Sequence, residues 1–175
     1  MELLTYFFTG DEWTSLQRLV IALILGAVVG FERERSGKVA GLRTHALVSV
    51  GAALFTVISI LIYEKFPSTS GVSGYDGRIV SNILVGIGFV GGGAILRTGT
   101  KVQGITTAAT LWVTAAIGTA AGFGFYREAL STTILAYFIL TVFWWLEKKF
   151  GHDIWYQNLN QEERTHAHVD NHAEE

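Results

Sequence analysis

The chain contains a long segment without acidic residues: from Gly77 to Arg127, 51 residues include no Asp and no Glu. Within it, Ile79–Leu96 and Val102–Tyr126 carry no charge at all and are separated only by Arg97–Lys101. An uncharged apolar run of about 18 residues or more is long enough to cross the ~30 Å hydrocarbon core of a bilayer as a helix. Two such runs joined by a short basic turn predict a transmembrane hairpin.

The remaining charges lie in short clusters between uncharged blocks. Half of the 175 residues are hydrophobic, and the mean hydropathy is +0.37. This distribution is typical of a polytopic membrane protein. The absence of cysteine excludes disulfides and thiolate metal sites. The basic residues are few and lie at the edges of the apolar runs, so no nucleic-acid binding is expected.

Five transmembrane helices are predicted, which makes the fold class an all-α, polytopic helical membrane protein. The predicted spans are Leu16–Phe31, His45–Tyr63, Ile79–Leu96, Ile105–Phe123 and Ala129–Leu146. They form one transmembrane domain over residues 1–150, followed by a short polar cytoplasmic tail over 151–175. The long side chain of Arg18 is expected to reach the headgroups from within the first span. The segment Leu3–Phe8 is too short to span and is expected at the interface, and Trp144 and Trp145 fit an interfacial aromatic belt.

The distribution of Lys and Arg predicts the orientation. Nine of the 13 fall in the loop between the first two spans, the loop between the third and fourth, and the tail. Positively charged loops remain on the cytoplasmic side. The N-terminus is therefore expected outside and the C-terminus in the cytoplasm. The N-terminus also lacks the basic segment of a cleavable signal peptide, so the first span is expected to remain uncleaved.

Glycines are frequent inside the predicted spans. The run Gly86–Gly91 matches the G-x-G-x-x-G dinucleotide fingerprint, but neither the flanking strand nor an acidic residue about twenty positions on accompanies it. We expect instead that the glycines let helices pack backbone to backbone. They are Gly26 and Gly30, Gly88 and Gly92, and Gly118 and Gly122, which have GxxxG spacing, together with Gly86, Gly91 and Gly93. Alternatively, Gly91–Gly93 opens the helix and presents backbone groups to an ion or a pathway.

Charged residues flank the first loop on both sides. Glu32 and Glu34 end the first span, and Arg43, Thr44 and His45 open the next only about ten residues later. An unpaired charge at membrane depth is costly. We therefore expect Glu32 and Arg43 to pair, directly or through Glu34 and His45, in a buried cluster that binds a cation or an anionic partner group. The alternative is a positively charged loop that only anchors the helices.

A second polar group enters the third span. Asp76 and Arg78 precede it, and Asn82 lies one turn deeper. Asp76 is suited to cap the helix N-terminus, and an Asp–Arg functional pair is the alternative. For Asn82 a hydrogen bond between helices is favoured over a ligand role. Three histidines of the tail could bind a transition metal weakly: His166, His168 and His172. Whether the chain binds a metal is otherwise open.

Several segments in order resemble the MgtC/SapB family of bacterial inner-membrane proteins. They are GAVVGFERER, GKVAGLRTHALVSVGAALF, GRIVSNILVGIGFVGGGAILR and VQGITTAATLWVTAAIGTAAGFG. The resemblance covers roughly Arg18 to Phe125. The family often has Asp-Pro-x-Arg before the third span, whereas here Asp76 precedes Arg78 by two positions. With Asn82 added to the positions that match the family's polar signature, the functional polar cluster comprises Glu32, Arg33, Glu34, Arg43, Thr44, His45, Asp76, Arg78, Asn82 and Arg97.

The resemblance implies a small inner-membrane protein with a regulatory role in adaptation to low magnesium, related to virulence proteins. Its implied partners are the lipid bilayer and another membrane protein such as the F-type ATP synthase, and a homo-oligomer is expected. The alternative is an ion transporter or channel that affects Mg²⁺ or the membrane potential. The residues indicate no enzyme and no cofactor, because no hydrolase arrangement and no cofactor motif is present.

Overall fold

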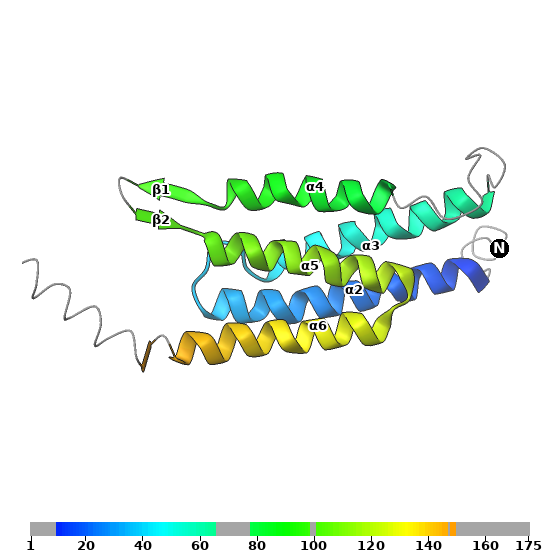
Figure 1. Cartoon of the computed structure of the whole chain (residues 1–175). Coiled ribbons are helices and arrows are strands. Elements are labelled where there is room, and N and C mark those ends of the chain that lie inside the picture. The colour runs from blue at the N-terminus through cyan, green and yellow to red at the C-terminus, as the bar shows by residue number, and fades with distance from the viewer. Residues whose placement is uncertain (1–9, 66–77, 99–100, 147, 150–175) are drawn as a thin grey trace, which may run out of the picture. The chain divides into compact units, whose positions relative to one another are not determined.

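The computed structural model describes residues 10–65, 78–98, 101–146 and 148–149. They fall into two units, the first ending at Tyr137 and the second beginning at Phe138. The first unit contains, in chain order, α2 (Gly10–Arg35), α3 (Leu42–Lys65), α4 (Arg78–Gly93), β1 (Leu96–Thr98), β2 (Lys101–Gln103), α5 (Ile105–Phe123) and nearly all of α6 (Tyr126–Phe138) (Figure 1). In the described part, four helices are long and apolar enough to cross a membrane, and α4 is a shorter apolar helix. The predicted helical, polytopic class is confirmed.

Helices α2, α3 and α5 pack against one another and form the core of the first unit. Glycines set their spacing. A Cβ atom added to Gly26 would lie 2.5 Å from the Cβ of Ser49, and one added to Gly118 would overlap the Ser49 carbonyl oxygen from the other side. Added Cβ atoms at Gly30 and Gly122 would also meet α3 or the residues just before it. Such close approach supplies the dispersion contacts that hold helices together in a bilayer.

Helix α4 packs against α5 and, more sparsely, against α3. Its contact with α5 includes Gly91, where an added Cβ would lie 3.5 Å from Ala108. Within 4 Å, open space surrounds the other glycines of α4: Gly86, Gly88, Gly92 and Gly93. The close contact predicted for Gly88 and Gly92 is therefore not made within the described chain, because α4 turns a different side towards α5.

The third predicted span does not continue as a helix to Leu96. Helix α4 ends at Gly93, and a two-stranded antiparallel hairpin follows, with Arg97 opposite Val102. Each glycine costs about 1 kcal/mol of helix propensity relative to alanine, so a run of three weakens the helix at this point. At 1.5 Å per residue, the 16 residues of α4 are about 24 Å long. The turn predicted to join two helices is thus a β-hairpin.

The hydrogen bonds at the end of α4 test the alternative that Gly91–Gly93 opens the helix and presents backbone groups to an ion. The backbone N–H groups of Ala94 and Ile95 donate to the carbonyl oxygens of Gly91 and Gly92 at 3.1 Å. These bonds tighten the last turn in the manner common at helix ends. Both carbonyls therefore have partners within the chain.

Two tight turns share one cause. Gly37 (φ 66°) follows α2, and Gly124 (φ 83°) follows α5, both in the left-handed region that side chains rarely adopt. After Gly124, the N–H of Phe125 donates to the carbonyl oxygen of Ala120, which is the bond of a Schellman motif. Compared with the predicted spans, helices α2, α3 and α6 begin several residues earlier, and α2 and α3 also end later. Glu32, which was predicted to follow the first span, therefore lies inside α2.

The second unit contains a π-helical turn, η1 (Ile139–Phe143). The Nζ atoms of Lys148 and Lys149 lie 5.4 and 5.0 Å from the ring centroids of Trp144 and Trp145. Both tryptophans are exposed. The predictions for residues 3–8, for Asp76 and for the tail 151–175 with its histidines lie outside the described residues.

Candidate functional site

A charged pair is buried near the end of α2. Glu32 is 6% exposed and Arg33 is 2% exposed. The Nε of Arg33 donates to Oε2 of Glu32 in an ion pair, and the hydroxyl of Ser36 donates to the other oxygen, Oε1, at 2.8 Å. Both carboxylate oxygens thus have a partner, which offsets part of the cost of removing the charges from water.

The predicted direct pair between Glu32 and Arg43 is not formed. Arg43 is exposed and has no ion pair with any described residue. The second predicted carboxylate has a different role, because Oε2 of Glu34 accepts the backbone N–H of Leu42 at 2.9 Å. Since the first N–H groups of a helix lack partners within it, this bond caps the start of α3.

His45 joins α3 to α5. It is completely buried, its Nδ1 lies 2.9 Å from the carbonyl oxygen of Gly41, and its Nε2 lies 3.2 Å from the hydroxyl of Thr110. A carbonyl oxygen only accepts, so Nδ1 carries a proton. The Thr110 hydroxyl also lies 2.8 Å from the carbonyl oxygen of Thr107. When the ring is neutral, this hydroxyl therefore has one proton for two acceptors.

Hydroxyl residues that the sequence analysis did not select add further buried polar groups to α3 and α5. The buried ones are Ser49, Thr56 and Ser59 on α3 and Thr107, Thr110 and Thr114 on α5. Ser49 donates to the carbonyl oxygen of Ala22 at 2.7 Å, and Thr114 donates to that of Thr110 at 2.8 Å. The spacing i, i+3, i+7 of the three threonines places them on one helix face, which is the signal that would have identified them.

The other predicted cluster members lie elsewhere. Thr44 is half-buried in the first turn of α3, Arg78 is exposed at the start of α4, and Arg97 is exposed in β1. Asn82 is exposed and lines a groove between α3 and α4. In the described ranges, no group of three or more His, Asp or Glu side chains is placed to hold a metal ion.

Arg18 also has a partner within the protein. It is half-buried, and its Nη1 donates to the carbonyl oxygen of Gly122 at 3.2 Å. A cation at a helix C-terminus is favourable because it complements the helix dipole and the unpaired carbonyl groups there. This side chain therefore links α2 to the end of α5, and its expected position at the headgroups stays a prediction.

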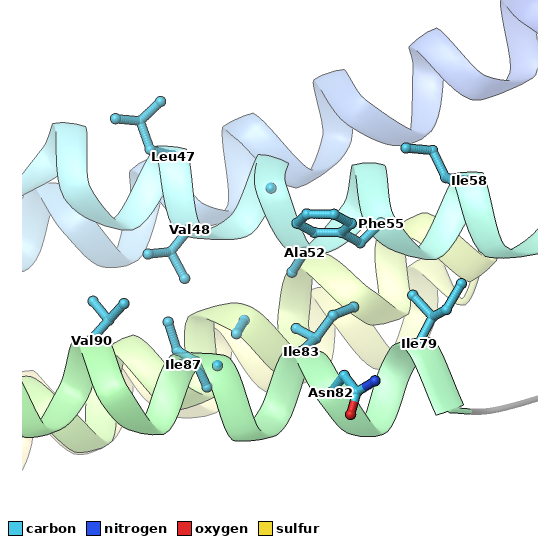
Figure 2. A pocket seen from close by; sticks show the side chains of 13 residues that line it. Leu47, Val48, Ala52, Phe55, Ile58, Ile79, Asn82, Ile83, Ile87 and Val90 are labelled. Atoms are coloured by element: carbon cyan, nitrogen blue, oxygen red, sulfur yellow. The ribbon is translucent and has the colours of Figure 1, made fainter.

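An apolar groove lies beside Asn82 in the first unit. It has a volume of about 590 Å³ and is lined from α3 by Leu47, Val48, Gly51, Ala52, Phe55 and Ile58, from α4 by Ile79, Asn82, Ile83, Gly86, Ile87 and Val90, and from α5 by Ala115. Figure 2 shows Val48 and Ala52 of α3 on the side that faces Ile83, Ile87 and Val90 of α4. Asn82 is the polar side chain in this lining.

Relatives of known name match most of this chain. The protein slr0014 of Synechocystis is 46% identical over 120 residues, which are 68% of this chain and 48% of that protein. MgtC of Salmonella typhimurium is 44% identical over 117 residues, 67% of this chain and 47% of that protein. YhiD of Escherichia coli, whose name proposes a magnesium transporter, is 40% identical over 126 residues, 72% of this chain and 59% of that protein.

The chain thus spans about half the length of the first two of these relatives. No solved structure matches it. The model of the MgtC family matches residues 19–149, which include α2 from its tenth residue, the polar cluster around Glu32 and His45, and the groove. This match covers more than half of the chain and agrees with the motifs recognised in its sequence. The chain is a multi-pass membrane protein and belongs to the MgtC family.

Proposed function

We propose that this chain is a regulatory protein of the bacterial inner membrane that acts in adaptation to low magnesium by binding other membrane proteins. The family membership supports the link to magnesium. The observation that carries the regulatory role is the closely packed core of α2, α3 and α5, whose buried hydroxyls donate to backbone carbonyl groups of the same bundle.

An ion path requires polar groups that face a water-filled cavity or an unwound backbone segment. In the described residues, the buried His45, Ser49 and Thr56 instead lie where glycines of α2 and α5 meet α3. At Gly118 and Gly122, even a methyl group would meet α3. The large groove, by contrast, is lined by apolar side chains apart from Asn82. A rigid scaffold that docks against other membrane helices fits this arrangement better than a carrier.

Transport remains the second candidate because one observation favours it. His45 and the hydroxyl residues of α3 and α5 form a polar surface inside the bundle, next to the Glu32–Arg33 pair at one end. Intramembrane polar residues often mark ion pathways. A rearrangement that separates α3 from α5 would expose this surface. The name of the E. coli relative points to the same alternative.

The partner belongs to the proposal as well. The spanning helices contact the lipid bilayer, and we propose the F-type ATP synthase as the membrane complex that is bound. A second copy of the chain is proposed as a further partner.

Two measurements test the proposal, one on the purified protein and one in cells. In proteoliposomes with a luminal Mg²⁺ indicator, we expect no Mg²⁺ flux above protein-free vesicles. In a strain that lacks the gene, we expect the wild-type chain to restore growth in limiting Mg²⁺ and to co-purify with the ATP synthase after mild solubilisation. Saturable Mg²⁺ flux would instead establish the transporter. Restored growth without any co-purifying membrane protein would overturn the regulatory mechanism.

A further inference from the structure

The groove between α3 and α4 owes its depth to two glycines. Gly51 on α3 and Gly86 on α4 both line it, and an added Cβ atom at either position would have no neighbour within 4 Å. Bulkier residues lie along its length, among them Phe55, Ile83 and Ile87 (Figure 2). Large apolar side chains therefore form the walls of the groove, and the two glycines, which have no side chain, leave the space between them.

The dimensions of the groove limit what can occupy it. From Ile79 to Val90, eleven residue steps of 1.5 Å give a length of about 16 Å along α4. The volume of the groove is about 590 Å³. A single hydrocarbon chain, whose carbons keep contact distances of about 4 Å, fits.

The lipid bilayer around the protein supplies such a hydrocarbon chain. An apolar hollow left empty forfeits the dispersion contacts of its walls, so a groove on a membrane protein is filled by what the bilayer offers. Arg78 begins α4, and Asn82 lies four residues, or about 6 Å, further along it. A phospholipid carries its phosphate, its ester oxygens and its acyl chain in this order, which matches the order of Arg78, Asn82 and the apolar walls.

We propose that this groove binds one acyl chain of a membrane phospholipid, with the ester oxygens at the amide of Asn82 and the phosphate near Arg78. The Asn82 amide supplies hydrogen-bond donors at a position that otherwise faces hydrocarbon, where an unpaired polar group is costly. The site is independent of the regulatory function proposed above, and its test does not rely on growth or on flux.

Filling the groove is the first test. Gly86→Leu and Gly51→Leu place a side chain in the hollow, while Gly88→Leu adds the same side chain on α4 about 200° around the helix, away from the lining. Native mass spectrometry of protein released from mild detergent measures bound phospholipid. We expect about one phospholipid per protomer in the wild type and in Gly88→Leu, and about tenfold less in the two filling variants, because methylene contacts are lost. Unchanged melting temperatures show that all variants are folded.

A photoreactive phospholipid with a diazirine in the middle of its acyl chain locates the occupant. Cross-links mapped by proteolysis should concentrate at Phe55, Ile83 and Ile87. Val85 and Phe89, which are exposed on other sides of α4, serve as controls. Equal labelling of the controls would show that the lipid belongs only to the surrounding bilayer and would overturn the proposal.

Three further outcomes decide the matter. Equal loss of lipid from Gly88→Leu and Gly86→Leu, or no retained lipid in the folded wild type, would refute the site. If the wild type is a dimer without bound lipid, and Gly86→Leu dissociates that dimer, the groove binds a second copy of the chain instead.

Asn82→Leu, of similar volume, should reduce phospholipid retention several-fold, because a hydrogen bond to the ester group is lost.

Discussion

At the scale of single residues, Glu32 and Arg33 form an ion pair between neighbours in the chain. Successive side chains on a helix point about 100° apart and do not normally face each other. Here the long arginine side chain returns to the carboxylate, and Ser36 completes its hydrogen bonds. The pair is buried at the end of α2, where a lone charge would be strongly unfavourable. Its two members therefore depend on each other.

Single and double substitutions of the pair should not be additive. We expect Glu32→Gln or Arg33→Gln alone to lower the free energy of unfolding by about 3–5 kcal/mol, because each leaves a buried charge unpaired. The double variant should lose less than the sum. Arg43→Gln is the control, since this exposed side chain should change stability by no more than about 0.5 kcal/mol. Thermal unfolding in detergent measures all four variants, and additive losses would show that the two charges do not interact.

At the scale of the helices, α3 is held between two glycine faces. Gly26 and Gly30 bring α2 against it, and Gly118 and Gly122 bring α5 against it. Ser49 takes part in both contacts, through its side chain towards α2 and through its backbone towards α5. The small residues thus allow three helices to pack closely together, and the Ser49 hydroxyl between them donates to the backbone of α2.

The same substitution on two helices should have opposite effects. Gly118→Ala places a methyl group on the backbone of α3 and should destabilise the protein by about 1–3 kcal/mol through overpacking. Gly88→Ala meets open space and should stabilise α4 by up to about 1 kcal/mol through helix propensity. Melting temperatures in one detergent compare the two. A loss of stability at Gly88 would indicate that another protomer covers that face.

At the scale of the molecule, the helices of the first unit alternate in direction (Figure 1). The loop after α2 and the β-hairpin lie at the same end, because His45 near the start of α3 contacts Thr110 near the start of α5. These two connections, together with the adjoining turns of α2 and α3, hold six of the 13 Lys and Arg residues. The positive-inside rule therefore predicts that this end faces the cytoplasm.

Reporter fusions test this orientation. Fusions after Phe150 and in the loop at 36–41 should report the cytoplasm, and a fusion within residues 67–74 should report the opposite side, because each apolar helix reverses the direction of the chain. A fusion at the hairpin, residues 99–100, should agree with Phe150 if α4 and the hairpin together cross the membrane. The same signal at Phe150 and at residues 67–74 would refute the predicted topology.

The sequence alone determined the helical class, the approximate position of each apolar helix and the family. The physical reason is that a bilayer offers the backbone no hydrogen-bond partners, so an apolar run of sufficient length becomes a helix whatever surrounds it. Even the exception is local: the glycines at 91–93 weaken α4, which ends three residues before the predicted Leu96, and the predicted turn that follows is a β-hairpin.

Which side of each helix faces a neighbour was decided only by the tertiary structure. Gly88 and Gly92 have the same spacing as Gly118 and Gly122, yet the first pair meets open space and the second pair meets α3. Likewise, Glu32 pairs with its neighbour rather than across the loop. The hydropathy of a segment predicts that it crosses the membrane. The residues that a side chain contacts, and the grooves between helices, depend instead on how each helix is rotated about its axis and how close its neighbours lie. The groove at Asn82 therefore could not be predicted from hydropathy.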